Sequence, residues 1–166
     1  IAIKFNNTFG ETFVLPEPQI NDEVATVPGI DGQKMSKSYD NTIEIFSDQA
    51  TLKRKVMGIT TDSTPVDQPK NTETCNLFQI YRHFAPPERV KEVHDLYVNG
   101  GAGYGTIKKE LLGILWDFFR ENREERTRLL NDPGHIHAVL AKGAAKARDI
   151  ASSTIEDVRR KVGLLY

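Results

Sequence analysis

The chain has 166 residues, of which 39% are hydrophobic and 27% are charged, and its formal net charge is −1. This balance excludes a disordered chain, and no apolar run approaches the roughly 20 residues that a bilayer span needs, so we expect no membrane association. One cysteine, Cys75, excludes an internal disulfide, and the absence of a signal peptide favours a cytoplasmic protein.

Short strands are the elements expected first along the chain. Ile1, Ile3 and Phe5 alternate with polar residues or alanine, which fits a strand or a frayed helix end equally well. Residues 10–15 and 23–27 are β-branched or aromatic runs separated by prolines, and they predict two short strands. Because the chain begins at Ile1 without an initiator methionine, we expect it to be a piece of a longer protein.

Helices are expected from residue 47 onward. Ser47 is a suitable N-cap for a helix that runs to about Met57, and a polar loop follows over residues 58–71. An apolar stripe predicts the next helix over residues 74–84. Two prolines then occupy the first turn of a further helix, which should bury three apolar side chains: Val90, Val93 and Tyr97.

The last third of the chain predicts three more helices. After a glycine cluster, apolar residues at spacings of three and four predict the longest helix, over residues 106–128. Asp132 with Pro133 opens a second helix, and Ser153 with Glu156 forms a capping box for a short third one. The whole chain is therefore predicted to be mainly α, with a strand-containing entry region that leads into an all-helical bundle.

Residues 28–41, PGIDGQKMSKSYDN, form the segment most suited to chemistry. This glycine-containing loop presents two ammonium groups, Lys34 and Lys37, between hydroxyl-bearing side chains. Flexible lysines are mobile point charges that can follow a polyphosphate as its charge shifts, and hydroxyl and backbone N–H groups can donate to phosphate oxygens. A solvated surface loop is the alternative for any isolated pair of lysines, but the strand before this segment and the helices after it favour a nucleotide loop.

The five residues of this loop, Lys34-Met35-Ser36-Lys37-Ser38, reproduce the KMSKS motif of the class I aminoacyl-tRNA synthetases letter for letter. Five further segments resemble the bacterial tryptophanyl-tRNA synthetases: FNNTFGETFVLPEP (5–18), YDNTIEIF (39–46), KRKVMGITTDS (53–63), GYGTIKKELLGIL (103–115) and AKGAAKARDIASSTIEDVRRKVGL (141–164). The resemblance therefore covers essentially the whole chain.

The resemblance implies a fold and an activity. Residues 1–46 would be the C-terminal edge of a Rossmann-type α/β catalytic domain, and residues 47–166 a helical domain that binds the tRNA anticodon region. The family joins tryptophan to its tRNA through tryptophanyl-adenylate, using ATP with Mg²⁺, and works as a homodimer. By position, Lys34 and Lys37 would act on the phosphates, and three neighbours would complete the ATP site: Met35, Ser36 and Ser38.

Two features of the family are missing from this sequence. The His-x-Gly-His motif is absent, because residues 134–137 hold the same letters in the wrong order, and the family's tryptophan pocket would lie upstream of Ile1. We therefore expect the 166 residues to be inactive alone. Some members of the family carry an iron–sulfur cluster with four cysteines, which the single Cys75 excludes here.

Charge is distributed unevenly along the chain. Residues 1–100 hold 10 basic and 14 acidic side chains, whereas residues 101–166 hold 12 and 9. Three cations of the C-terminal part with few acidic neighbours are candidates for contact with tRNA: Lys142, Lys146 and Arg148. Two alternatives to a tryptophanyl enzyme remain, namely a piece of a tyrosyl-tRNA synthetase and a non-catalytic helical module that binds tRNA.

Overall fold

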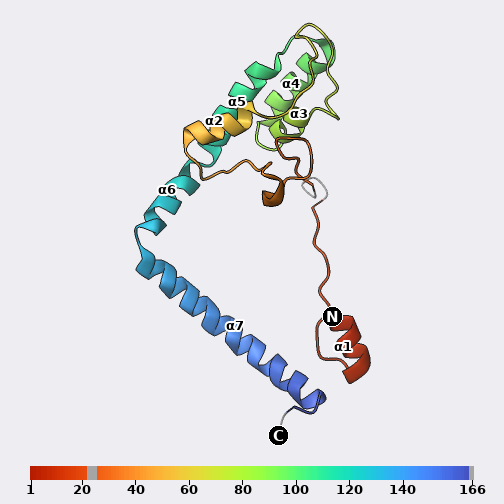
Figure 1. Cartoon of the computed structure of the whole chain (residues 1–166), viewed down its shortest axis with the longest axis vertical. Coiled ribbons are helices and arrows are strands. Elements are labelled where there is room, and N and C mark those ends of the chain that lie inside the picture. The colour runs from red at the N-terminus through yellow and green to blue at the C-terminus, as the bar shows by residue number, and fades with distance from the viewer. Residues whose placement is uncertain (22–25, 165–166) are drawn as a thin grey trace. The chain divides into compact units, whose positions relative to one another are not determined.

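The computed structural model describes residues 1–21 and 26–164, and it is mainly helical, as predicted. The chain divides into two compact units. Figure 1 labels the helices and colours the chain by residue number. The central unit consists of Asn21–Thr127, and the terminal unit combines Ile1–Ile20 with Arg128–Tyr166. Within the described residues, no helix has the length and apolar character needed to cross a membrane.

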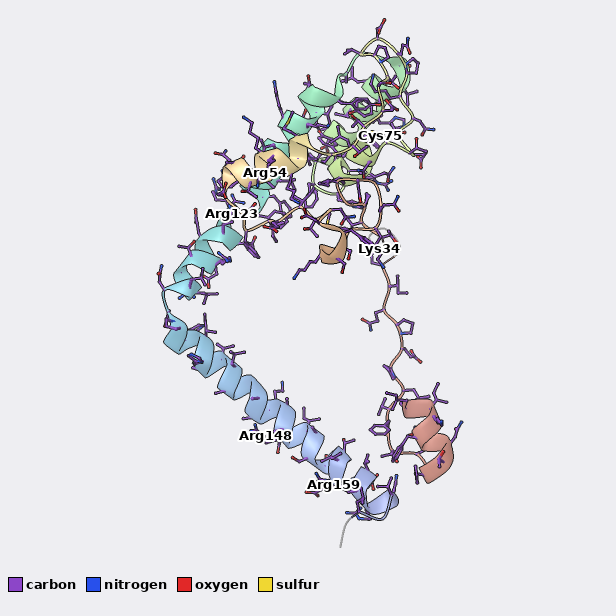
Figure 2. The ribbon with its side chains drawn as sticks, in the orientation of Figure 1. Lys34, Arg54, Cys75, Arg123, Arg148 and Arg159 are labelled. Atoms are coloured by element: carbon purple, nitrogen blue, oxygen red, sulfur yellow. The ribbon has the colours of Figure 1, made fainter. Side chains whose placement is uncertain are left out.

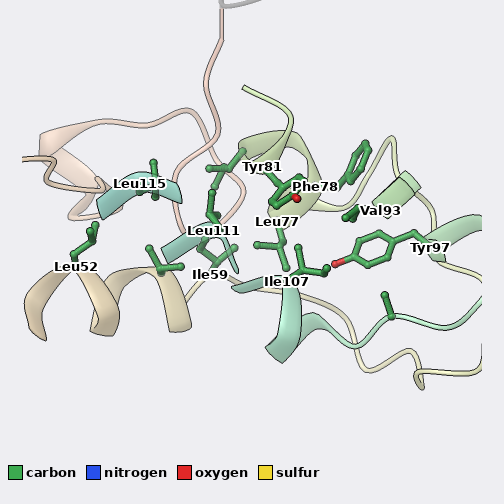
Figure 3. Close-up of a cluster of buried hydrophobic side chains, with 13 residues drawn as sticks. Leu52, Ile59, Leu77, Phe78, Tyr81, Val93, Tyr97, Ile107, Leu111 and Leu115 are labelled. Atoms are coloured by element: carbon green, nitrogen blue, oxygen red, sulfur yellow. The ribbon is translucent and has the colours of Figure 1, made fainter. Parts of the chain in front are cut away.

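Four helices of the central unit surround its hydrophobic core: α2 (Gln49–Met57), α3 (Asn76–Tyr81), α4 (Pro87–Asn99) and α5 (Tyr104–Phe118). Helices α2 and α3 pack against α5, whose buried residues recur every four positions. Figure 3 shows the core, which the following buried side chains form: Leu52, Val56, Ile59, Leu77, Phe78, Ile80, Tyr81, Val93, Tyr97, Ala102, Ile107, Leu111 and Leu115. The expected stripes of α3, α4 and α5 are therefore largely confirmed, with Val90 only partly buried.

A polar network joins three of these helices beside the core. Arg89 of α4 donates from Nε to one carboxylate oxygen of Glu110 at 2.7 Å and from a terminal nitrogen to the other at 2.9 Å. The hydroxyl of Tyr81 donates to the same carboxylate at 2.6 Å. A paired guanidinium and carboxylate with a third donor is a strong, directional contact, so it fixes α3 and α4 against α5.

The long loop before α3 is organised by a buried lysine. The side chain of Lys70 is among the least exposed polar groups of the protein, and its ammonium lies over the rings of Tyr97 and Tyr104. A Cβ on Gly100 would lie 2.5 Å from the carbonyl oxygen of Asp67, so only glycine lets this loop approach so closely. The ammonium donates to three backbone carbonyls, those of Pro65, Val66 and Gln68.

The predicted helix over residues 106–128 is interrupted in the structure. α5 ends at Phe118, and α6 (Arg120–Leu130) begins directly after Phe119, whose φ of −96° and ψ of 14° leave the helical region. The guanidinium of Arg123 stacks on the Trp116 ring, 3.7 Å from its centroid, and donates to the Trp116 carbonyl. Neither proline nor glycine marks this break, so the sequence carried no signal for it.

The terminal unit contains α1 (Ala2–Phe9) and α7 (Pro133–Lys161), and the strand predicted over residues 10–15 is wrong. This segment instead turns back on α1 because the side chain of Asn6 holds its backbone. Asn6 accepts from the N–H groups of Thr12 and Phe13 and donates to the Phe13 carbonyl at 2.8 Å. Of the alternatives for Ile1, Ile3 and Phe5, the helix is confirmed. Lys161 of α7 donates to the backbone of Glu11 at 2.6 Å.

Helix α7 is the longest helix of the described chain, with 29 residues. Asp132 caps it by accepting from the N–H of His135 at 3.0 Å, as predicted. The separate short helix expected at Ser153 is wrong, because the Ser153 hydroxyl donates to the Ile150 carbonyl inside a continuous helix. Gly163, at a φ of +78°, terminates it as predicted.

Candidate functional site

The predicted nucleotide loop begins as a short hairpin in the central unit. Of the strand predicted over residues 23–27, residues 23–25 lie outside the described residues. Residues 26–27 form no strand, although the Val27 carbonyl is bonded across the hairpin. The N–H of Met35 donates to the Val27 carbonyl at 2.9 Å, and the N–H of Gly29 donates to Gln33 at 2.7 Å. Gly32 closes the turn at a φ of +84°, which few other residues tolerate. Lys34 therefore lies on a paired rung opposite Pro28.

The hairpin is fastened to the helical core by backbone and side-chain contacts. Asn76, at the start of α3, donates from its amide to the carbonyls of Gly29 at 2.9 Å and Ile30 at 3.3 Å. The N–H of Thr60, just after α2, donates to the Ile30 carbonyl at 2.7 Å. These bonds join segments that lie 30 to 47 residues apart, so the base of the loop is part of the folded core.

Asn41, which follows the hairpin in the chain, also bonds to it. Its side chain is 1% exposed, although its neighbours in the loop are mostly exposed. The side-chain oxygen accepts from the N–H of Ser36 at 2.7 Å, and the side-chain amide donates to Asp31 at 2.9 Å and to the Lys34 carbonyl at 3.1 Å. The backbone carbonyl of Asn41 accepts from Ile30 at 2.9 Å. All the polar atoms of this side chain are therefore in use.

The tip of the loop is one short 3₁₀ turn, η2 (Lys37–Tyr39). The hydroxyl of Ser36 caps it by accepting from the N–H of Ser38 at 3.3 Å. Asp40 ends the turn at a φ of +50°, and Lys55 of α2 donates to both its carbonyl and its carboxylate, at 3.0 and 2.8 Å. That ammonium lowers the pKa of the Asp40 carboxyl from its usual value. The turn is therefore held at its C-terminal end by Lys55, next to the buried Asn41.

The two lysines of the loop line different hollows of the central unit. Lys34, which Figure 2 labels, shares a hollow of about 400 Å³ with Arg82 and His83 of the α3 end. Lys37 lines a hollow of about 600 Å³ with apolar neighbours that include Ile43 and Phe46. Within the described part of the chain, neither lysine has a hydrogen bond or an ion pair with another side chain. Both ammonium groups can therefore bind an anion without breaking an internal contact.

The remaining residues of the predicted ATP site lie on the same loop. Met35 and Ser36 are half-buried, and Ser38 is exposed. Met35 lines the hollow of Lys37 rather than that of Lys34. The hydroxyl of Ser38 is accessible, whereas the hydroxyl of Ser36 is already used as a cap. The five predicted residues are thus close in the structure, but their side chains serve two hollows instead of one.

The three cations predicted to contact tRNA lie on α7 in the terminal unit, and all are exposed. Lys142 and Lys146 are four residues apart and share one helix face, because successive residues of a helix turn by about 100°. Arg148 is about 200° away from Lys146 and shares its face with Arg159, which Figure 2 shows further along α7. The predicted trio therefore divides into a lysine pair and an arginine on another face.

A metal site is not evident in the described residues, where no group of three or more His, Cys, Asp or Glu side chains could hold an ion. Cys75 precedes α3 as a free, half-buried thiol. Burial raises the pKa of this thiol above its usual value, which keeps it protonated and unreactive near neutral pH.

Sequence reasoning missed three residues that hold the loop: Asn41, Asn76 and Lys55. Each is a polar residue at a helix terminus, in a loop or on a helix surface, where solvent exposure is the ordinary expectation. No periodicity distinguishes a buried loop asparagine from an exposed one. The nearest signal for Asn41 was its residue type, because asparagine side chains in turns commonly bond to nearby backbone.

Comparison with known proteins gives a consistent picture. A family model described as tRNA synthetases class I (W and Y) matches residues 1–120. The chain is 46% identical over 164 residues to a tryptophan–tRNA ligase of Campylobacter jejuni, covering 99% of this chain and 51% of that protein. It is 45% identical over 166 residues to a tryptophan–tRNA ligase of Fusobacterium nucleatum, again covering 99% of this chain and 51% of the relative.

A solved structure resembles the chain over nearly its whole length. The crystal structure of tryptophanyl-tRNA synthetase from Campylobacter jejuni complexed with ADP and tryptophan matches with a TM-score of 0.80 and 46% identity. The match covers 98% of this chain and 51% of that one. The chain therefore spans about half the length of the relatives that it matches.

Proposed function

The chain belongs to the class I tRNA synthetases of the tryptophan and tyrosine group, and from this premise we propose that it supplies the ATP-binding loop and the tRNA-facing helices of a tryptophan–tRNA ligase. The observation that carries the proposal is the pair of unpartnered ammonium groups, Lys34 and Lys37, on a loop whose base is fastened to a helical core. The relatives at 45–46% identity are named tryptophan–tRNA ligases, which favours tryptophan over tyrosine.

In the proposed reaction, a carboxylate oxygen of tryptophan attacks the α-phosphorus of ATP. The new bond joins this oxygen to phosphorus, and the bond to the bridging oxygen of the β-phosphate breaks, so pyrophosphate leaves with the electron pair. Negative charge grows on the departing oxygens. Lys34 and Lys37 are suited to neutralise this charge, because neither ammonium is committed to a carboxylate of the described chain, and Ser38 can donate a hydroxyl.

The other parts of the proposal follow from the same family. ATP would enter with Mg²⁺, for which this chain is proposed to supply no protein ligand. Residues 1–46 would be the edge of the Rossmann-type catalytic domain and residues 47–166 the helical tRNA-binding domain. We include a homodimer and a cytoplasmic location in the proposal, and a tryptophan pocket contributed by residues outside this chain.

The test is amino-acid-dependent exchange of pyrophosphate into ATP by the full-length protein that carries these residues. We expect exchange with tryptophan and none with tyrosine. Exchange with tyrosine alone would replace the substrate and keep the loop chemistry. If neither amino acid supports exchange while tRNA still binds in a salt-dependent way, the chain is a non-catalytic tRNA-binding module. The 166 residues alone should give no exchange, since they contain no His-x-Gly-His motif.

Substitution of Lys37 separates the role of the loop from general effects. Lys37→Ala should lower the rate of exchange by about 10²–10³-fold, because it removes a charge that acts on the developing pyrophosphate. The affinity for tryptophan should stay unchanged in the same variant. Lys91→Ala, on the exposed surface of α4, is the matched control and should leave both quantities unchanged. An equal loss of rate and of tryptophan affinity in Lys37→Ala would contradict the assigned role.

A further inference from the structure

The side chain of Asn41 holds the backbone of the loop between its two lysines. Asn41 bonds to two backbone groups that flank Met35: the carbonyl of Lys34 at 3.1 Å and the N–H of Ser36 at 2.7 Å. With both groups held by one planar amide, the backbone between them has a fixed direction. Lys34 and Lys37 flank this stretch of backbone and line two separate hollows.

The space that Asn41 occupies is matched to the opposite side of the hairpin. A Cβ built on Gly29 would lie 2.4 Å from the side-chain carbonyl carbon of Asn41 and 2.7 Å from its backbone oxygen. Real Cβ atoms do not come that close to another heavy atom, so glycine at position 29 is required for the Asn41 side chain to enter. Asn41 and Gly29 therefore form one interlocking pair at the base of the loop.

The two lysines differ in how firmly their backbones are held. Lys34 lies in the hairpin, with its carbonyl bonded to Asn41 and its rung paired with Pro28. Lys37 lies on η2, where the backbone bonds of the turn are long: 3.2 Å from Tyr39 to Ser36 and 3.3 Å from Asp40 to Lys37. One short 3₁₀ turn with such bonds is a weakly held element.

We propose that Asn41 is a positioning residue: it fixes Lys34 on the rigid base of the loop and confines movement to the turn that carries Lys37. This inference rests on the proposed function, since it assigns different duties to the two lysines in the same reaction. Lys34 provides a positive charge at a fixed position for the polyphosphate, and Lys37 moves toward the polyphosphate. A buried amide with every polar atom bonded is suited to this role, because any change leaves a neighbour unsatisfied.

The first test measures tryptophan-dependent pyrophosphate exchange in the full-length protein. Asn41→Ala should lower the rate by about 10–10²-fold, as expected for a displaced reacting group, and leave the affinity for tryptophan unchanged. Asn99→Ala is the matched control, because Asn99 is an exposed asparagine that also donates one bond, to Asp95. Asn41→Asp should lose as much as Asn41→Ala, because a carboxylate cannot donate to Asp31 or to the Lys34 carbonyl.

A double-mutant cycle then separates positioning from general instability. If Asn41 acts through Lys34, Asn41→Ala should cost little further rate in a Lys34→Ala background. Independent, multiplied losses would show that Asn41 only supports the fold, and the proposal would be overturned. A fall in tryptophan affinity that parallels the fall in rate would overturn it as well.

A third measurement does not depend on catalysis. Trypsin cleaves after lysine only where the backbone can leave its hydrogen bonds, so the native protein should be cut after Lys37 and resist cutting after Lys34. In Asn41→Ala, cutting after Lys34 should become comparable to cutting after Lys37. An unchanged pattern would overturn the inference even if exchange occurs. A changed pattern in a protein without exchange would instead refute the proposed function.

Discussion

Helices α5 and α7 start from similar sequence patterns, with apolar residues every three or four positions, and they reach different structures. Three residues of α5, Ile107, Leu111 and Leu115, are at most 2% exposed. Within the described residues of α7, no side chain is buried, and Leu140 and Ile150 are each 63% exposed. A periodic pattern thus predicts that a helix forms, but not what it packs against. We expect stability to reside in the α2–α5 core, while α7 presents an accessible surface.

The largest expected effect is the loss of stability when a buried core residue of α5 is shortened. Leu111→Ala should lower the free energy of unfolding by about 2–5 kcal/mol, because it opens a cavity among fully buried side chains. Leu140→Ala, the matched change on α7, should stay within about 0.5 kcal/mol. Urea unfolding monitored by circular dichroism measures both values. A large loss for Leu140→Ala would show that α7 has a buried partner.

The next prediction tests whether the charge of Glu110, in the polar network beside the core, contributes to the free energy of unfolding. The hydrogen bond from Arg89, followed by that from Tyr81, lowers the pKa of Glu110 in the folded protein. A lowered folded pKa stabilises the fold above the unfolded value of about 4.3, and this stability is lost as pH falls through the folded pKa. Glu110→Gln should cost about 1–2 kcal/mol at neutral pH, because Arg89 is partly exposed and screened by solvent.

The same variant should flatten the acid limb of the stability curve. Below about pH 4.3, the unfolding free energy of the native protein should fall more steeply than that of Glu110→Gln. Glu92→Gln removes the exposed partner of Arg89 and serves as the control, with an expected change under about 0.5 kcal/mol. Parallel curves for the native protein and Glu110→Gln would show that Glu110 does not contribute to the pH dependence of the unfolding free energy.

A smaller effect is expected for the surface of α7. If the face of Lys142 and Lys146 meets tRNA, replacing both with alanine should reduce the salt dependence of binding by about 0.7 in slope for each lost phosphate contact. Arg148→Ala, on another face, should then leave the slope unchanged. Filter binding of tRNA to the full-length protein between low and moderate salt provides the measurement. The reverse result would assign the contact to the Arg148 face.

The smallest effects concern two helical glycines with open space around them, Gly113 in α5 and Gly143 in α7. Alanine at either position should favour its helix by about 0.8–1 kcal/mol. Only Gly113→Ala should raise the melting temperature of the core, since α5 unfolds with it. Gly143→Ala should increase helicity without moving that transition. A shift of the core melting temperature by Gly143→Ala would show that α7 unfolds cooperatively with the core.

Local chemistry explains how much of the fold could be predicted. The start of α7 at Asp132 and Pro133 was predictable because a cap acts within four residues. For α2 the predicted cap was one residue early: Asp48 accepts from the N–H of Thr51 at 2.8 Å, whereas the Ser47 hydroxyl donates to Glu44. The strand predicted over residues 10–15 was wrong, because the side chain of Asn6 holds this segment in place of a partner strand.

The candidate site divides in the same way. The letters of the loop predict that it binds a nucleotide, and this role stays a prediction, whereas the grouping of the five residues on one loop follows from their adjacency in sequence. Its support could not be predicted, since Asn76 reaches Gly29 from 47 residues away and Asn41 is buried only because Gly29 makes room. We infer that the separation of Lys34 and Lys37 into two hollows depends on this support. A motif therefore specifies which groups are present, and the tertiary contacts specify where they point.

The ammonium group of Lys70 gathers backbone carbonyl oxygens around it, as a bound potassium ion does in a cyclic ligand. Backbone carbonyls of Pro65, Gln68 and Val66 converge on its ammonium at 2.7, 3.1 and 3.4 Å, and two aromatic faces close the shell. An ion held this way could exchange with solvent, and the loop would then respond to the ionic composition of the cell. Because this cation is covalently tethered to the chain, we expect the loop to keep its shape when the ionic composition of the solution changes.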